Sequence, residues 1–202
     1  MAVRGSGDAT RKNVLAAAAD LVAAEGASKL TLDAVAERIG LSKGGLLHHF
    51  ATKDSLIAAM IDDVTTQFED DLFRHMQGES GPGSFARAFL RACLDPEGVL
   101  TRQLRVSAGI LAAVAINSQL LSPLRHRYAE WRLRLENDGI DPAIAELVRS
   151  AADGLWLGNV LELGPMSEAL RKRVFAKLIE LTHLGVGGPP VPAPESGLSR
   201  GV

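Results

Sequence analysis

The sequence is poor in cysteine, and it contains no long uncharged run of apolar residues. The single cysteine, Cys93, excludes an internal disulfide bond and a zinc site built from several cysteines. A membrane span would need about 18 or more consecutive apolar residues, and no stretch of that length is free of charge. The first residues, MAVRGSGDAT, lack the apolar core of a signal peptide. We therefore expect a cytoplasmic protein in a reducing compartment, with no membrane partner.

Aromatic residues are also scarce, at 4% of the chain, and β-branched residues do not alternate with polar ones. Strands are therefore not predicted. Residues 9–184 instead show the helical spacing of apolar residues, interrupted by short segments rich in glycine, proline and serine. The sequence predicts an all-α fold, and its 202 residues suffice for a small domain joined to a larger one.

Helix starts are marked by residues that commonly cap helices. The first helix is predicted from about Thr10 to Glu25, and the fourth from Thr52 to about Gln77. The apolar segment LTRQLRVSAGILAAVAI, residues 100–116, is predicted to form one buried helix. The other predicted starts are Thr31, Ser42, Ser84, Ser122 followed by Pro123, Asp141 followed by Pro142, and Ser167.

The net charge of −2 does not by itself suggest a nucleic-acid partner. Residues 1–57 contain seven Lys or Arg residues and six Asp or Glu residues, a net charge of +1. Residues 58–184 contain 14 basic and 17 acidic residues, a net charge of −3. This mild asymmetry is compatible with a DNA-binding N-terminal segment but does not establish one.

The segment LSKGGLLHHFATKDSL, residues 41–56, places two adjacent glycines in predicted helical sequence. Two short helices joined by GLS at residues 40–42 have the spacing of a helix-turn-helix. Leu46 and Phe50, four residues apart, share the face toward the core. The opposite face then presents Lys43, Gly44, Leu47 and His48.

Glycine inside a helix costs about 1 kcal/mol relative to alanine, so Gly44 and Gly45 need an explanation. A bare backbone would let the start of this helix approach base edges and phosphates closely. Alternatively, the two glycines belong to the turn and the helix starts later. The sequence leaves both interpretations open.

The segment TLDAVAERIGLSKGGLLHHFATKDSL, residues 31–56, resembles the signature of the tetracycline repressor (TetR) family of transcriptional regulators. The remaining chain resembles the family only in its helix pattern. The resemblance implies an N-terminal three-helix helix-turn-helix DNA-binding domain over residues 1–55. A C-terminal helical domain for ligand binding and dimerisation would span residues 56–185. Residues 186–202 are rich in glycine and proline, and we expect this tail to be disordered.

The resemblance also assigns roles to individual residues of the motif. Ser42 would cap the third helix, the helix that enters the major groove. Three positions would face base edges, namely Lys43, Gly44 and Gly45, and lysine can donate to guanine O6 and N7. Four positions would reach phosphates: Thr31, His48, His49 and Lys53.

One position departs from the family, because Leu47 stands where a tyrosine is usual. The loss of the hydroxyl removes a phosphate contact. Leu47 either touches a thymine methyl group or widens the core face of its helix. The two interpretations are equally compatible with the sequence.

No metal, cofactor or catalytic site is predicted. His48 and His49 are neighbours on a helix and point about 100° apart, so they do not easily share one metal ion. The sequence contains no nucleotide-binding glycine loop and no recognisable order of Ser, His and Asp. We therefore do not expect an enzyme.

Effector-pocket residues are predicted from the aromatic and polar residues of the C-terminal helices. A buried polar side chain must find a partner, and an aromatic residue can line a pocket or fill the core. The candidates are Gln103, Asn117, Trp131, Trp156 and Asn159.

The last two long helices are the predicted dimer interface. In LVRSAADGLWLGNVLELG and EALRKRVFAKLIELTHLG, apolar residues cover more of the circumference than one core contact needs. Small residues, among them Gly154 and Gly158, would let a partner helix approach. Two reading heads about 34 Å apart would meet successive major grooves. The resemblance implies a homodimeric repressor on a palindromic operator, released by a small-molecule effector. The alternative is a dimeric DNA-binding protein that needs no ligand.

Overall fold

The computed structural model describes residues 4–94, 101–164 and 166–184. Within these ranges the regular structure is helical, which confirms the predicted all-α fold. The elements are α1 (Arg4–Glu25), the 3₁₀ turn η1 (Ala27–Lys29), α2 (Leu32–Arg38), α3 (Lys43–His49), α4 (Lys53–Met76), α5 (Ser84–Leu94), α6 (Thr101–Ile116), the 3₁₀ turn η2 (Ser118–Leu121), α7 (Ser122–Glu136), α8 (Pro142–Val160) and α9 (Glu168–Leu184).

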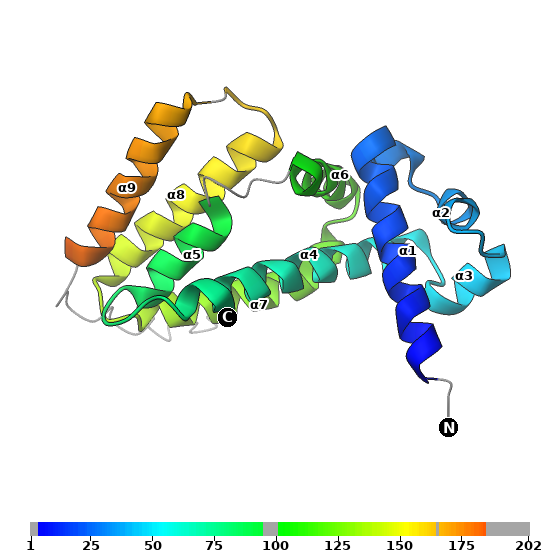
Figure 1. The fold of residues 1–202 in the computed structure, drawn as a ribbon, viewed down its shortest axis with the longest axis horizontal. Helices are drawn as coiled ribbons and strands as arrows, with labels where there is room; N and C mark the ends of the chain where they lie inside the picture. Colours follow the sequence, from blue (N-terminus) through cyan, green and yellow to red (C-terminus); the bar gives the residue numbers. More distant parts are fainter. Residues whose placement is uncertain (1–3, 95–100, 165, 185–202) are drawn as a thin grey trace, which may run out of the picture.

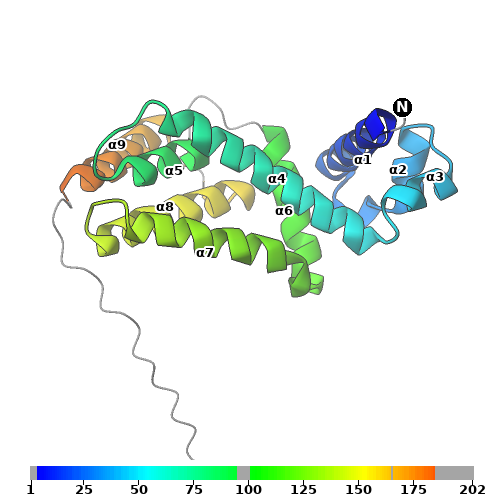
Figure 2. The same ribbon diagram turned by 90° about the horizontal axis from the view of Figure 1, so that it is seen from below.

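The helices form two groups joined by a long helix. Helices α1, α2 and α3 lie together at one end of the molecule, and α4 extends from them along its length (Figure 1). Helices α5, α8 and α9 gather at the other end, α7 runs beside α4, and α6 lies between the two groups (Figure 2). Helix α4 therefore belongs to both groups and connects them directly.

Two hydrophobic clusters follow this arrangement. The first contains the buried residues of α1, α2, α3 and the first half of α4, together with Val106 and Val114 of α6. The second contains Leu72 near the end of α4 and most of the buried apolar residues of α5, α7, α8 and α9. The contribution of α6 to the first cluster means that the C-terminal part of the chain packs directly on the N-terminal helices.

The contact between α6 and α1 is very close at Gly109. A Cβ atom at this position would lie 2.1 Å from Cγ1 of Val22, which is buried in the first cluster. Only glycine lets the two helix backbones come this near. Because Gly109 has no side chain, α6 can pack tightly against α1.

Most predicted capping residues act as expected. The Thr31 hydroxyl accepts the Ala34 amide, and the Thr52 hydroxyl accepts the Ser55 amide in a reciprocal capping box. The caps at Ser42, Asp141 and Ser167 also accept main-chain amides of the helices that follow them. These caps can be predicted from sequence because each acts on amides only two or three residues away.

Two predicted caps are wrong. The carboxylate of Asp138 caps α5 instead of Ser84, because its oxygens accept the amides of Phe85 at 2.9 Å and Ala86 at 2.8 Å. Burial raises the pKa of the Asp138 carboxyl, and these hydrogen bonds lower it by less. Ser122 lies inside α7, whose N-cap position is Leu121 without a side-chain hydrogen bond. The expected Pro123 does occupy the first turn.

Two helices also differ from their predicted extent or burial. Helix α1 begins at Arg4, six residues before the predicted Thr10. Helix α6 is not buried throughout: Val106 and Val114 are buried, whereas Ile116 is 90% exposed. An apolar segment can thus lie on the surface when only one of its faces meets the core. The tail predicted to be disordered, residues 186–202, lies outside the described residues.

A buried arginine fixes the loop between α4 and α5. Arg87 donates to the carboxylate of Glu79 and to the carbonyl oxygens of Ser80 and Pro82. Arg91 donates to the other oxygen of the same carboxylate at 3.0 Å. Burial alone would raise the pKa of Glu79, but the two guanidinium groups outweigh it and hold the pKa below its ordinary value.

Candidate DNA-binding surface and effector cavity

The third helix begins at Lys43, so both glycines of the motif lie in its first turn. The interpretation that they belong to the preceding turn is therefore wrong. The Ser42 hydroxyl accepts the Gly45 amide at 3.1 Å, which fixes the start of the helix one residue before Lys43. Leu46 and Phe50 are buried on the core side, as their spacing predicted.

The other side of α3 faces solvent. Lys43, Gly44 and His48 are exposed, and a Cβ atom at position 44 would meet no atom within 4 Å. The packing of the protein therefore does not require glycine there. At position 45, by contrast, a Cβ atom would approach the Ser42 hydroxyl to 3.2 Å, so Gly45 also makes room for the cap.

Leu47 lies on the same outer side, with 38% of its surface exposed. It is absent from the first hydrophobic cluster, which takes only Leu46 from α3. The interpretation that Leu47 widens the core face is therefore not supported. An exposed leucine on the face opposite the core remains available for contact with a partner.

The predicted phosphate contacts come from three different helices. Thr31 is exposed at the start of α2, and Lys53 is exposed as the first residue of α4. His48 is exposed and His49 half-buried at the end of α3, with ring centroids 5.6 Å apart in an edge-to-face arrangement.

Sequence reasoning missed two contacts of this surface. The Lys43 ammonium lies 3.0 Å from both carboxylate oxygens of Asp33, in the first turn of α2. The Arg11 guanidinium of α1 lies 4.4 Å from the ring centroid of Phe50. Neither pair follows from sequence spacing, because each depends on how two helices pack against one another.

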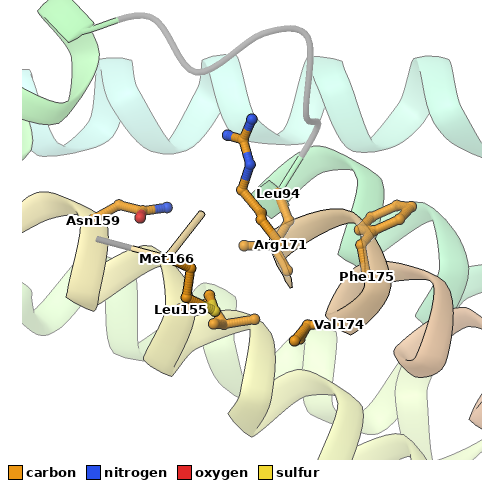
Figure 3. Close-up of a pocket in the computed structure, with 7 residues that line it drawn as sticks. All are labelled: Leu94, Leu155, Asn159, Met166, Arg171, Val174 and Phe175. Atoms are coloured by element: carbon orange, nitrogen blue, oxygen red, sulfur yellow. The ribbon is translucent and has the colours of Figure 1, made fainter. Parts of the chain in front are cut away.

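A small cavity of about 20 Å³, partly open to solvent, lies in the C-terminal group of helices. Its lining comes from the end of α5, from α8, from α9 and from the segment between α8 and α9 (Figure 3). The lining residues are Leu94, Leu155, Asn159, Met166, Arg171, Val174 and Phe175. Five of the seven are apolar, and Asn159 and Arg171 supply the polar groups.

Of the predicted pocket residues, only Asn159 has a described side chain in this lining. Asn117 lies instead at the start of η2, where it donates to Asp54 of α4 at 2.9 Å. Trp131 is buried among other aromatic rings and donates to Glu69 at 3.3 Å. Trp156 is half-buried on α8 outside the cavity, and the side chain of Gln103 lies outside the described residues.

The cavity residues that were missed share a simple property. Met166, Val174 and Phe175 are ordinary apolar residues, and nothing in the sequence marks them as lining rather than core. Arg171 is one of four Lys or Arg residues in α9 and cannot be singled out by spacing. Their common position becomes visible only when α5, α8 and α9 are brought together.

A second group of titratable side chains lies between α5, α7 and α8. The Tyr128 hydroxyl donates to Asp153 at 3.1 Å, and Arg149 also pairs with Asp153. Burial raises the pKa of the Cys93 thiol well above its ordinary value and also raises that of Tyr128. Because the thiolate is the reactive form of cysteine, Cys93 is poorly suited to act as a nucleophile.

The described residues contain no group of three or more His, Cys, Asp and Glu side chains that could hold a metal ion. No helix among them combines the length and the apolar character needed to cross a membrane.

Comparison with known proteins now decides the family. The family model "Tetracyclin repressor-like, C-terminal domain" matches residues 83–183, half of the chain. A second model, "Bacterial regulatory proteins, tetR family", matches residues 14–60. The chain belongs to the TetR family. It is therefore a helix-turn-helix transcriptional regulator, as the motif at residues 31–56 indicated.

Individual relatives of this TetR-family regulator are distant. The transcriptional repressor KstR2 of Rhodococcus jostii is 29% identical over 168 residues, which cover 83% of this chain and 71% of that protein. A transcriptional regulator from Rhodococcus sp. Rha1 has a TM-score of 0.70 with 24% identity, over 89% and 100% of the two chains. A regulator from Saccharomonospora viridis in complex with choline has a TM-score of 0.68 with 16% identity, over 86% and 96% of the chains. At these identities the two solved structures support the fold alone.

Proposed function

We propose that this TetR-family regulator is a cytoplasmic homodimeric repressor, which binds a palindromic operator and leaves it when a small molecule enters the C-terminal cavity. The observation that carries the proposal is the outer face of α3. That face exposes a cation, a bare backbone and an apolar side chain at Lys43, Gly44 and Leu47, while Leu46 and Phe50 anchor the helix in the core.

The outer face of α3 suits the major groove of DNA. A lysine donates to guanine O6 and N7, and an aliphatic side chain contacts the thymine methyl group. Thr31 of α2 and Lys53 of α4 would hold the adjacent phosphates, which position the helix without reading sequence. The packing of the protein would allow a side chain at position 44. The glycine there is therefore better explained by a close approach of DNA.

Exposed leucines on the last helices support the homodimer. Leu147 and Gly154 share one face of α8, and Leu161, the residue that caps its C-terminal end, follows at the same seven-residue interval. Leu147 is 60% exposed and Leu161 is 46% exposed, and a Cβ atom at position 154 would meet nothing within 4 Å. Leu170 on α9 is also exposed. A second copy of the chain would bury this surface.

The residues that line the cavity support an effector that is mostly apolar and carries a polar group, and the surrounding helices would have to move apart to admit it. Asn159 offers both a donor and an acceptor, and Arg171 contributes donors, within an otherwise apolar lining. The relative KstR2 is a transcriptional repressor, and the regulator from Saccharomonospora viridis, which is similar in fold, forms a complex with choline.

The switch would be a shift between two populated arrangements of the reading heads. Helix α6 contacts α1 at Gly109, and the turn that follows it contacts α4 through Asn117 and Asp54. An effector that favours another position of the C-terminal helices would therefore move the start of α4. The distance between the two copies of α3 would then no longer fit successive grooves.

Selection of duplexes from a random pool by the purified protein tests this proposal. We expect an enriched sequence with two inverted half-sites about one helical turn apart. A thermal-shift screen of small metabolites should then find a compound that raises Tm and lowers affinity for the enriched duplex. If the selection enriches no sequence, the proposed operator is contradicted. If a sequence is enriched but no stabilising compound lowers the affinity for it, the ligand-independent alternative is favoured.

A further inference from the structure

The ion pair between Asp33 and Lys43 lies on the surface that the proposed function assigns to DNA. Lys43 is the first residue of α3, and Asp33 is the second residue of α2. The ammonium lies 3.0 Å from each carboxylate oxygen, and both side chains are 65% exposed. An exposed pair of this kind contributes little to folding.

The position of Asp33 is unfavourable for binding to phosphates. It lies two residues after Thr31, which would contact the DNA backbone, and it neutralises the cation nearest to the predicted base contacts. An ammonium group that is paired with a carboxylate is less available to the phosphates of DNA of any sequence. Because residues 1–57 have a net charge of only +1, a single acidic side chain changes the net charge of this segment substantially.

We infer that Asp33 is a positioning residue for Lys43 that raises sequence specificity by competing with phosphates for its ammonium group. This inference rests on the proposed function. On unrelated DNA the ammonium stays with the carboxylate, which lies beside it. On the operator a guanine edge offers two acceptors, O6 and N7, directly in front of α3. Lys43 then contributes to operator binding and contributes little to other sequences.

A structural role for Asp33 makes the opposite prediction. An acidic residue in the first turn of α2 also favours the positive end of the helix dipole. If this were its whole role, Asp33→Asn would lower Tm and weaken binding to every duplex. If Asp33 competes for Lys43, the same substitution strengthens binding to unrelated duplexes.

The experiment compares two probes: the duplex enriched from a random pool by the wild-type protein, and a scrambled duplex of equal composition. We expect Asp33→Asn to bind the scrambled duplex about threefold or more tightly at 50 mM salt, with a slope of log K against log salt steeper by about 0.9. Affinity for the enriched duplex should rise less, so the ratio of the two affinities falls. Glu25→Gln is the matched control, since Glu25 forms an exposed pair with Arg38 at the far end of α1, and both affinities should stay unchanged.

A double-mutant cycle shows whether Asp33 acts through Lys43. In the Lys43→Ala background, Asp33→Asn should no longer change binding to the scrambled duplex. An undiminished effect in that background overturns the inference, because Asp33 would then repel DNA directly. Equal changes on both duplexes, or weaker binding to both, also overturn it. If the wild-type protein enriches no duplex at all, the proposed function fails and this inference fails with it.

Discussion

The Asn117 side-chain amide donates a hydrogen bond to Oδ2 of Asp54 at 2.9 Å, and this joins the end of α6 to the first turn of α4. Lys53, the predicted phosphate contact, is the neighbour of Asp54 in the chain. The same Asn117 side chain accepts the Gln119 amide at 3.2 Å and so caps η2. One residue of the C-terminal part thus orients the helix start that would grip DNA.

Reversing this hydrogen bond tests its role in DNA binding. Asn117→Asp keeps the acceptor that caps η2 but places two carboxylates against each other, so we expect affinity for a selected operator duplex to fall about three- to tenfold. The double variant Asn117→Asp with Asp54→Asn again pairs a donor with an acceptor. Its affinity should recover most of what Asn117→Asp loses, and it should exceed the affinity of Asp54→Asn alone. Titrations by fluorescence anisotropy measure all four proteins. No recovery in the double variant would show that the contact itself is unimportant.

The two lysines of the DNA-binding surface should behave differently. Lys43→Ala removes a base contact, so we expect specific binding to weaken by about 1–3 kcal/mol, with a smaller effect on unrelated duplexes. Lys53→Ala removes a phosphate contact, so binding to all duplexes should weaken and the salt slope should decrease by about one. Titrations at two salt concentrations measure both. Equal losses for the two variants on every duplex would contradict the assignment of base and phosphate contacts.

The exposed face of α8 provides a test of the dimer. Leu147→Arg places a charge on the predicted interface, and we expect the dissociation constant of the dimer to rise at least about a hundredfold. Leu133 on α7 has the same exposure of 60%, so Leu133→Arg is the matched control and should leave the dimer intact. Sedimentation velocity over a range of concentrations measures the oligomeric state. A stable dimer for Leu147→Arg would place the interface elsewhere.

The buried pair of Glu79 and Arg87 should make stability depend on pH. The pKa of Glu79 in the folded state lies below its ordinary value of 4.5, so its contribution is present above pH 4.5 and is lost as the pH falls through the folded-state pKa. We expect Glu79→Gln to lower the free energy of unfolding by about 3 kcal/mol at pH 7, with the difference from wild type shrinking below pH 4.5.

Urea denaturation at several pH values measures this difference. Glu168→Gln is a suitable control, because the pKa of Glu168 is also lowered by its partner Lys172, but on the protein surface. Its unfolding midpoint should remain close to that of the wild type. A constant difference between Glu79→Gln and wild type across the pH range would contradict the role of the charge.

The prediction from sequence succeeded where the determining contacts are local. The caps at Thr31, Ser42 and Thr52 act on amides three residues away, and the core side of α3 follows from the four-residue spacing of Leu46 and Phe50. Such relationships are fixed by helix geometry and do not require knowledge of the rest of the fold.

The prediction failed where two distant segments meet. Ser84 is a good capping residue, but a carboxylate from the loop between α7 and α8 reaches the amides of α5 instead. Asn117 is a polar residue that directly follows the apolar helix α6, and its partner is Asp54 in the first turn of α4 rather than an effector. Sequence patterns indicate that such a side chain needs a partner, but not which helix supplies it.

The cap of α5 has a consequence for how the protein is made. During synthesis the amides of Phe85 and Ala86 emerge long before Asp138, which is their only acceptor among the described contacts. Until that residue leaves the ribosome, the start of α5 lacks the carboxylate that anchors it in the finished molecule. The side-chain caps of α2, α3 and α4 are local and can form on the nascent chain, whereas the start of α5 must wait for the turn after α7.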